Sequence, residues 1–290
     1  MEFRTAAILF IAGIPAVALP AAGSAACSVH SGQRTAALIE LYTSEGCSSC
    51  PPADQKLARL PQALEPGAEA FALALHVNYW DSIGWQDPYA QSVFSERQSW
   101  LVHANHHDVV YTPHFFVSGT ELSPGQDGLR DEVIRVNARP AKAEIQLNSS
   151  RTSNGALMID VVAHAPEGVG PAALYFALAE NGLVSKVLRG ENGGLTLTHE
   201  HVARTWIGPI VLTNGTAQVH REMSLPGGAV PAQLELVAFV EDEHTGKILQ
   251  AVGSQACTRA ETPVSRATEF SVPGSESRSS NSTRSTRGDG

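Results

Sequence analysis

The 290-residue sequence predicts two folded units in succession, an α/β domain over residues 27–140 and an all-β sandwich over residues 141–260. Three observations support this prediction. In the first unit, short apolar stretches alternate with segments of helical periodicity, which is the pattern of a mixed α/β sheet. Beyond Pro140, apolar residues recur at every second position, as they do in half-buried strands. Asn-Gly pairs punctuate the second unit, and such pairs accept the positive φ angles of hairpin turns.

The two ends of the chain are expected to lie outside these units. Residues 1–26 combine Arg4, an apolar run and several small residues, which is typical of a cleaved secretory signal. We therefore expect a periplasmic or secreted protein, or alternatively a lipoprotein acylated at Cys27. Residues 261–290 are rich in Ser, Arg and Gly with few apolar side chains, so they predict a disordered tail.

A C-x-x-C sequence, Cys47 to Cys50, organises the first unit. An apolar stretch over residues 36–42 leads into it, and Pro51 opens a segment with leucines at helical spacing. Strand, C-x-x-C and helix in this order form the redox end of a thioredoxin-like unit. Two cysteines at a helix start can close a small disulfide ring, and the positive helix end stabilises a thiolate on the first. We expect Cys47 to be the accessible, acidic nucleophile and Cys50 the resolving thiol.

The segments that follow complete a thioredoxin-like α/β topology. Apolar runs and periodicity predict, in order, a buried parallel strand at 70–77, a helix at 89–105, strands at 114–117 and 120–122, and a helix at 127–138. The expected order is therefore βαβ, then a helix, then ββα.

Three further residues are candidates for the dithiol site. Pro113 opens the strand at 114–117, and we expect a cis Thr112–Pro113 bond beside the dithiol, which leaves the backbone at Thr112 free to pair with a substrate. The alternative is an ordinary strand-initiating proline.

Glu40 lies in the apolar strand that leads to the C-x-x-C, where burial would raise its pKa and let it exchange a proton with Cys50. Alternatively, Glu40 lies at a strand edge and reaches water.

An aromatic loop over residues 78–88 carries Trp80 and Trp85, which either cover the dithiol and contact a substrate or pack as core. His114 follows the candidate cis proline and could join the two cysteines in holding a soft ion such as Cu(I). We nevertheless expect no metal and no cofactor, because no second Cys or His pair follows the C-x-x-C at the short spacing of a zinc site.

The two remaining cysteines stand far apart in the sequence. Cys27 precedes the first strand of the α/β unit, and Cys257 ends the last strand of the sandwich. Because thiols seldom stay free in an oxidising compartment, we predict a Cys27–Cys257 disulfide.

Composition limits the partners. The formal net charge is −9 without any basic stripe, which argues against nucleic-acid binding. No segment of the mature chain is long and apolar enough to span a membrane. The expected partners are thiols or disulfides of exported proteins, or a redox partner protein.

Several motifs together resemble a known family. They are ELYTSEGCSSCPPAD (residues 40–54), HVNYWD (76–81), GWQDP (84–88), YTP (111–113), GENGG (190–194) and HVAR (201–204). The chain resembles exported thioredoxin-like proteins of bacteria and plants that are catalogued as a domain of unknown function, over roughly residues 35–257. The resemblance implies a thioredoxin-like fold, and it implies activity only by analogy with thioredoxin.

The predicted function is thiol–disulfide exchange on other exported proteins. Cys47 would attack a substrate disulfide, and Cys50 would resolve the mixed disulfide. Two alternatives remain from other classes: a soft-metal (copper) binding or handling protein, and a non-catalytic interaction module with a thioredoxin fold.

Overall fold

The computed structural model describes residues 27–123 and 128–254. The strands are β1 (Cys27–His30), β2 (Ala37–Thr43), β3 (Ala70–His76), β4 (His114–Val117), β5 (Thr120–Glu121), β6 (Glu144–Arg151), β7 (Leu157–His164), β8 (Ala172–Glu180), β9 (Leu183–Lys186), β10 (Thr196–His199), β11 (Val202–Val211), β12 (Thr216–Met223), β13 (Leu234–Asp242) and β14 (Ile248–Gly253). The helices are α1 (Pro51–Ala58), α2 (Leu60–Ala63), α3 (Ser92–Ala104) and α4 (Leu129–Asn137), with 3-10 turns η1 (Asp81–Ile83) and η2 (Pro231–Gln233). The predicted signal segment and tail lie outside the described residues, as does Cys257 of the predicted Cys27–Cys257 pair.

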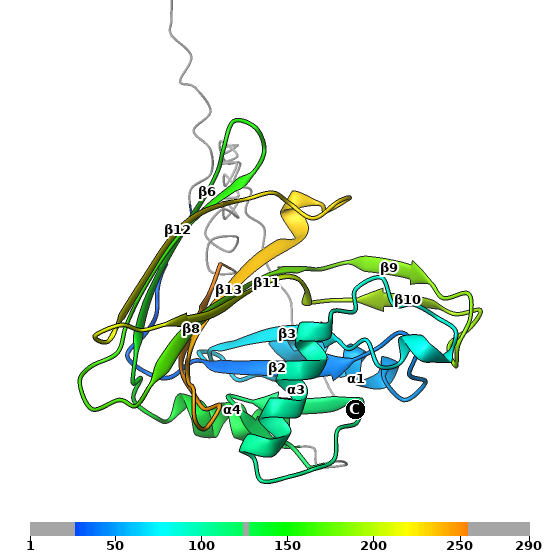
Figure 1. Cartoon of the computed structure of the whole chain (residues 1–290), viewed down its shortest axis with the longest axis horizontal. Helices are drawn as coiled ribbons and strands as arrows, with labels where there is room; N and C mark the ends of the chain where they lie inside the picture. The colour runs from blue at the N-terminus through cyan, green and yellow to red at the C-terminus, as the bar shows by residue number, and fades with distance from the viewer. Residues whose placement is uncertain (1–26, 124–127, 255–290) are drawn as a thin grey trace, which may run out of the picture.

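An eight-stranded sheet runs through both halves of the chain, in the order β14-β13-β8-β11-β3-β2-β4-β5 (Figure 1). Within it β2 is parallel to β3 and antiparallel to β4, and β5 is antiparallel to β4. The halves meet where β11 pairs with β3 through Val202 and Ala74. The two predicted units therefore share one sheet. The sequence did not indicate this, because periodicity identifies strands without naming their neighbours.

The two faces of this sheet are covered differently. Side chains alternate along β2, so Leu38 and Tyr42 point towards α3 while Ile39 and Leu41 point towards α1 and α4. All four are completely buried. α3 crosses the front of the sheet in Figure 1, and the C-x-x-C loop, which immediately precedes α1, belongs to the opposite face. This division into two faces decides which buried acids can reach the cysteines.

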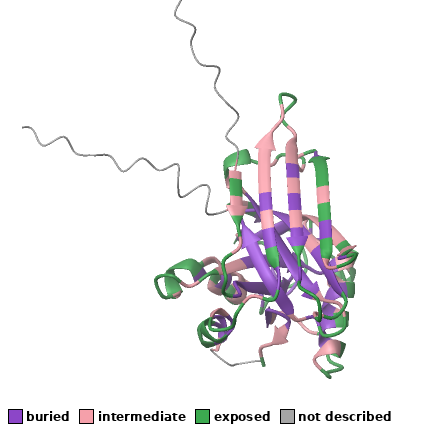
Figure 2. Ribbon diagram, turned by 90° about the vertical axis from the view of Figure 1, so that its left-hand side faces the viewer, coloured by how far each residue is buried: buried purple, intermediate pink, exposed green. Residues whose placement is uncertain are grey.

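A second, four-stranded sheet, β1-β6-β7-β12, covers the β8, β13 and β14 part of the large sheet on the face away from α3. Its inward side chains alternate with half-buried or exposed ones, which produces the banding along the strands in Figure 2. The residues at the centre of this interface are Ile145, Leu147, Ile159 and Val161 from one sheet and Leu174, Phe176, Leu236 and Ala238 from the other. β1, expected with the α/β unit, pairs instead with β6.

The β9–β10 hairpin and its connecting turn, residues 183–199, form a separate two-stranded arm. The arm extends past α1 at the right of Figure 1, next to the end of β2 that leads into the C-x-x-C.

Across the described residues, no helix has both the length and the apolar character needed to cross a membrane.

Candidate functional site

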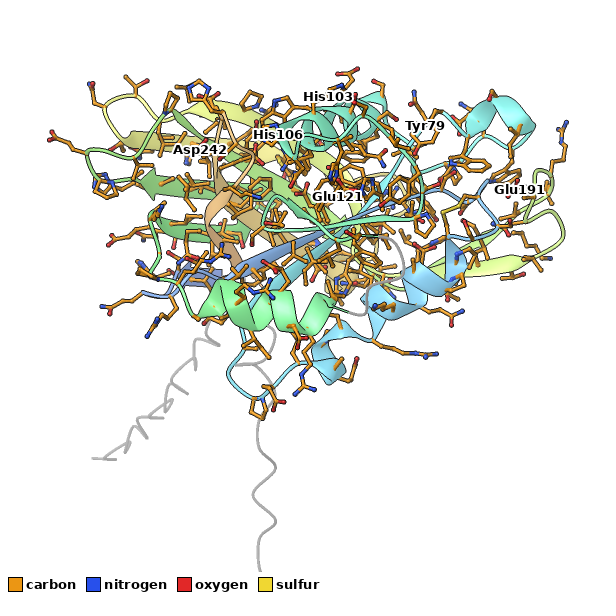
Figure 3. All side chains as sticks on the ribbon, turned by 90° about the horizontal axis from the view of Figure 1, so that it is seen from below. Tyr79, His103, His106, Glu121, Glu191 and Asp242 are labelled. Atoms are coloured by element: carbon orange, nitrogen blue, oxygen red, sulfur yellow. A yellow bond between two sulfur atoms is a disulfide. The ribbon has the colours of Figure 1, made fainter. Side chains whose placement is uncertain are left out.

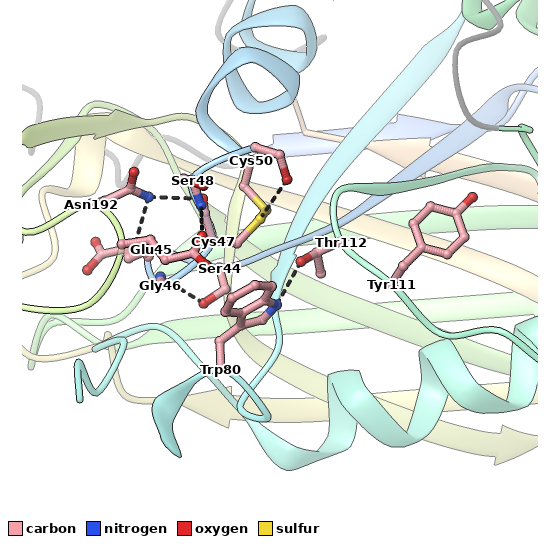
Figure 4. The surroundings of a disulfide bond; sticks show 12 residues. Ser44, Glu45, Gly46, Cys47, Ser48, Cys50, Trp80, Tyr111, Thr112 and Asn192 are labelled. Atoms are coloured by element: carbon pink, nitrogen blue, oxygen red, sulfur yellow. Dashed lines mark hydrogen bonds between the residues drawn. A yellow bond between two sulfur atoms is a disulfide. The ribbon is translucent and has the colours of Figure 1, made fainter. Parts of the chain in front are cut away.

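Cys47 and Cys50 form a disulfide in the loop between β2 and α1 (Figure 4). Their Cα atoms are 5.4 Å apart, and Cys50 is the N-cap residue of α1. The Cys50 carbonyl accepts hydrogen bonds from the amides of Ala53 and Asp54, at 2.8 and 3.1 Å. Both cysteine side chains are 0% exposed. The expectation that Cys47 is accessible is therefore wrong for the disulfide form, because neighbouring segments cover both sulfurs.

The start of α1 has fewer amide donors than an ordinary helix. Pro51 and Pro52 occupy its first two positions, and neither has a backbone N–H. The Cys50 amide already donates to the Cys47 carbonyl at 3.2 Å. The Ser49 hydroxyl, whose Oγ lies 3.3 Å from Cys47 Sγ, is positioned to donate to a Cys47 thiolate. The Ser49 hydroxyl thus supplies a donor near Cys47 Sγ where the first two helical positions, both proline, supply none.

Trp80 connects the C-x-x-C loop to the segment before β4. Its Nε1–H donates to Thr112 Oγ1 at 2.8 Å, and its Cβ would lie 3.2 Å from a Cβ built on Gly46 (Figure 4). The Thr112–Pro113 bond is cis, which confirms the predicted isomer. The structure therefore brings Trp80 and Thr112 close to the C-x-x-C loop.

Trp85 takes a different place. Its Nε1–H donates to Glu45 Oε2 at 2.7 Å, and its Cβ lies against Gly190 of the arm. Trp85 therefore packs between the loop before Cys47 and the arm, next to the loop backbone and not on the sulfurs.

The prediction that Glu40 serves Cys50 is wrong. Glu40 points to the α3 face, where Arg97 Nε donates to Glu40 Oε1 at 2.6 Å and Arg97 Nη2 donates to Glu241 Oε2 at 2.5 Å. Cys50 belongs to the opposite face of the sheet, with α1. The alternation of β2 side chains places Glu40 with Leu38 and Tyr42, so the backbone of the sheet separates it from the disulfide.

The acid on the dithiol's own face is Asp54, a partly exposed residue that the sequence analysis missed. It lies one helical turn after Cys50, and this i,i+4 spacing is the signal that could have identified it. Burial raises the pKa of the Asp54 carboxyl, against a smaller opposing effect from nearby His76. Its Oδ1 is buried and accepts no hydrogen bond from any residue in the described ranges. Asp54 is therefore placed to gain or lose a proton.

Two His–carboxylate pairs lie near Asp54. His76 Nδ1 is 2.7 Å from Asp87 Oδ2, and His199 Nε2 is 3.0 Å from Glu45 Oε1. The two imidazole rings are 5.1 Å apart, at a near-perpendicular angle. Burial lowers the pKa of His76, but the Asp87, Asp54 and Glu45 carboxylates together outweigh burial and raise this pKa overall.

The structure holds His114 away from the dithiol. Its Nε2 is 2.9 Å from Glu121 Oε1, and its ring stacks on Tyr111 with centroids 3.9 Å apart. It pairs across the strands with Tyr42, on the α3 face. Within residues 27–123 and 128–254, no three His, Cys, Asp or Glu side chains converge closely enough to hold a metal ion. The third ligand that the copper alternative requires is not found among these residues.

The tip of the arm binds the backbone of the C-x-x-C loop. Asn192 Nδ2 donates to the carbonyls of Glu45 and Cys47, both at 2.9 Å (Figure 4). Glu191 Oε2 accepts a hydrogen bond from the Ser48 amide at 2.9 Å. The GENGG motif marked this segment, but no local pattern could show that it contacts a loop about 145 residues earlier in the chain.

Replacing Asn192 by alanine is expected to lower the free energy of unfolding by about 2 kcal/mol, because two backbone carbonyls lose their buried partner. Urea denaturation of the oxidised protein measures this loss. Asn148→Ala is the control, since Asn148 accepts one exposed hydrogen bond from Ser28 and its loss should cost less than about 0.5 kcal/mol. Equal stability of the two variants would show that the Asn192 contacts contribute little.

Comparison with known proteins identifies a family and a fold. The model of a family described as a protein of unknown function (DUF1223) matches residues 38–241. The structure is similar to HBP35 of Porphyromonas gingivalis, with a TM-score of 0.60 and 17% identity over 77% of this chain and 76% of that one. It is also similar to the crystal structure of protein AGR_C_4864 from Agrobacterium tumefaciens, with a TM-score of 0.55 and 20% identity over 77% of this chain and 96% of that one.

At these identities, the structural similarity shows a shared fold alone. No curated protein matches the sequence. The family match includes both cysteines of the C-x-x-C, the Thr112–Pro113 segment and the arm. Because it covers more than half of the sequence, the chain belongs to the DUF1223 family.

Proposed function

We propose that the protein is an exported thiol–disulfide oxidoreductase that acts on other exported proteins through the Cys47–Cys50 pair, without a cofactor. The observation that carries this proposal is a disulfide within a C-x-x-C at the start of a helix, with a buried carboxyl group, Asp54, one turn further along. A C-x-x-C at the start of a helix is a common setting for exchange-active cysteines.

The arrangement of the first half supports a thioredoxin-like unit. β2, which leads to the C-x-x-C, lies between the parallel strand β3 and the antiparallel strand β4, with β5 at the edge. α1 and α4 cover one face of these strands and α3 covers the other. The order of these elements, βαβ, then α, then ββα, supports the proposal.

The proposed reaction transfers two electrons between dithiol and disulfide. In the reducing direction, the Cys47 thiolate attacks one sulfur of a substrate disulfide and the second substrate sulfur leaves as a thiolate. Asp54 accepts the proton of Cys50, and the Cys50 thiolate then attacks Cys47 Sγ. This step releases the first substrate sulfur and leaves the Cys47–Cys50 disulfide. The reverse sequence oxidises a substrate dithiol.

The buried sulfurs add one requirement to this mechanism. Exchange needs direct approach of a sulfur to Cys47 Sγ, and Cys47 is completely covered in the disulfide form. Trp80, which packs on Gly46 and is partly exposed, is the side chain whose displacement would uncover the loop beside Thr112. A substrate would thus enter between Trp80 and the Thr112–Pro113 segment.

The second candidate function is a non-catalytic interaction module, in which the disulfide only stabilises the loop. The burial of both sulfurs favours this candidate, because inaccessible disulfides resist exchange. The two candidates differ in whether the pair equilibrates with external thiols.

The deciding experiment is a redox titration combined with trapping. We expect the wild-type pair to equilibrate with glutathione buffers and to reduce or oxidise a model protein disulfide. Cys50→Ser should accumulate a mixed disulfide through Cys47, because the resolving thiol is absent, and Cys47→Ser should lose at least about 1,000-fold in turnover since the nucleophile is gone. A native pair that stays oxidised in strongly reducing buffer and turns over no disulfide would favour the interaction module.

A further inference from the structure

Glu191 places a carboxylate on the C-x-x-C loop from a distant part of the chain. It lies at the tip of the arm, at the right-hand end of the molecule in Figure 3, and its Oε2 accepts the Ser48 amide at 2.9 Å. Hydrogen bonding from Ser48 lowers the pKa of the Glu191 carboxyl, so this group is ionised at neutral pH. The neighbouring Asn192 is buried and holds the arm in place through its two bonds to the loop backbone.

Backbone donors close to Cys47 are scarce, so the use of one by Glu191 has consequences. The Cys47 amide donates to the Ser44 carbonyl, and the Cys50 amide donates to the Cys47 carbonyl, each at 3.2 Å. The two residues that open α1 are prolines without an N–H. The amides of Ser48 and Ser49 are the remaining backbone donors of the motif, and Glu191 accepts the first of them.

We propose that Glu191 is a positioning residue that keeps the reduction potential of the Cys47–Cys50 pair low, by holding a negative charge on the Ser48 amide next to the site of the Cys47 thiolate. This inference rests on the proposed exchange function. A like charge nearby disfavours the thiolate, and competition for the amide removes one of its donors. The reduced form is thereby destabilised, and a dithiol whose reduced form is less stable has a more negative potential.

The other ionisable groups around the loop leave Glu191 as a distinct contributor. The Glu45 carboxylate is bonded to His199 and Trp85, and the Asp54 carboxyl lies deeper, beside His76. Glu191 is the carboxylate that bonds an amide within the motif itself and is also open to solvent. Its charge can therefore be removed without opening the core.

The test is Glu191→Gln, which keeps a hydrogen-bond acceptor for Ser48 and removes the charge. We expect the equilibrium constant against glutathione to shift threefold to tenfold towards the dithiol, which corresponds to a potential about 15 to 30 mV less negative. In the Cys50→Ser background, alkylation of Cys47 as a function of pH should give a lower thiol pKa with Glu191→Gln than without it.

Glu200→Gln is the matched control. Glu200 follows the same arm, is partly exposed, and accepts the Gly182 amide at 3.0 Å, at the opposite end of the arm from the C-x-x-C loop. Its substitution removes the same charge from the protein and should leave the potential unchanged.

Three results would overturn the inference. A Glu191→Gln potential equal to that of Glu200→Gln would show that the charge does not act on the pair. A shift to a more negative potential would show that Glu191 acts in the opposite sense. A wild-type pair that fails to titrate at all would overturn the exchange function and this inference together, whereas the first two results leave exchange itself intact.

Discussion

Replacing Arg97 by methionine is expected to lower the free energy of unfolding by about 3 to 5 kcal/mol, because two buried carboxylates lose their only shared cation among the described residues. Arg97 donates to Glu40 through Nε and Nη2, at 2.6 and 3.2 Å, and to Glu241 at 2.5 and 3.2 Å. Both carboxylates are 0% exposed. Methionine has a similar length, so the loss of charge dominates over the loss of volume.

The surroundings of Arg97 explain why its charge matters. Its guanidinium carbon lies 5.1 to 6.0 Å from the centroids of four aromatic rings, those of Trp100, Tyr175, Trp206 and Phe239. Burial lowers the pKa of Arg97, but the Glu241 and Glu40 carboxylates more than compensate and raise its pKa overall. Burial raises the pKa of Glu241 even with Arg97 present. Without Arg97, the Tyr42 hydroxyl, a neutral donor 3.2 Å from Glu40 Oε1, offsets little of the desolvation of the two acids.

Urea denaturation at several pH values measures this effect. Burial already raises the pKa of Glu241 with Arg97 present, and without Arg97 this pKa should lie further above its unfolded value. Protonation of Glu241 then favours the folded state, so the loss of stability in Arg97→Met should shrink as the pH falls. The triple variant with Glu40→Gln and Glu241→Gln should recover most of the loss, because no buried charge remains. Arg135→Met, which removes an exposed arginine from its pair with Glu132, should change stability by less than about 0.5 kcal/mol. A loss in Arg97→Met that does not vary with pH would indicate a packing effect instead.

The local elements could be predicted because their signals are local. The apolar runs at 36–42 and 70–77 correspond to β2 and β3, and the periodic segment at 127–138 contains α4. The Cys47–Cys50 disulfide could also be predicted locally, because it needs only two cysteines three positions apart. The cis Thr112–Pro113 bond could be predicted because proline permits a cis bond.

The relations between distant segments could not be predicted in this way. Nothing in the alternation along β11 shows that Val202 pairs with Ala74, and nothing in residues 190–194 shows that Asn192 bonds the backbone of Cys47. Both contacts form between residues more than a hundred positions apart, and a single sequence contains no measure of such proximity. The joining of the two halves in one sheet and the covering of the dithiol by the arm are therefore tertiary features.

Glu40 and Asp54 show which side-chain positions can be predicted from local sequence and which cannot. Alternation along β2 assigns Glu40 to the face of Leu38 and Tyr42, but it does not say which face α1 will cover. Helical spacing does better for Asp54, because i,i+4 neighbours share a helix face wherever that helix packs. An acid on the helix that follows Cys50 can therefore be assigned to the dithiol from sequence more securely than an acid on a neighbouring strand.

Asp54→Asn is expected to reduce activity and raise stability at the same time. If Asp54 accepts the Cys50 proton, its loss should slow the attack of Cys50 on a mixed disulfide by about 100-fold or more, the usual contribution of a general base. The attack of Cys47 on the substrate should be little affected. Stopped-flow measurement with a preformed Cys47 mixed disulfide separates the two steps.

The pH dependence follows from the buried state of Asp54. Burial raises its folded-state pKa above the unfolded value, so the contribution of Asp54 to stability is most favourable below the unfolded pKa and is lost as the pH rises through the folded pKa. Asn does not ionise, so the stability advantage of Asp54→Asn should grow between acidic and neutral pH. The wild-type rate of resolution should rise over the same interval, because only the carboxylate can accept a proton, and the variant should lack this rise.

Glu40→Gln provides the control, because Glu40 is a completely buried acid that lies across the sheet with Arg97. It should lower stability, since Arg97 loses a charged partner, and leave the rate of mixed-disulfide resolution unchanged. Asp54→Glu should retain part of the rate, because a carboxyl group remains on the same face of α1. A normal resolution rate in Asp54→Asn together with a slow one in Glu40→Gln would reverse the assignment, and would mean that the proton of Cys50 leaves by way of the α3 face.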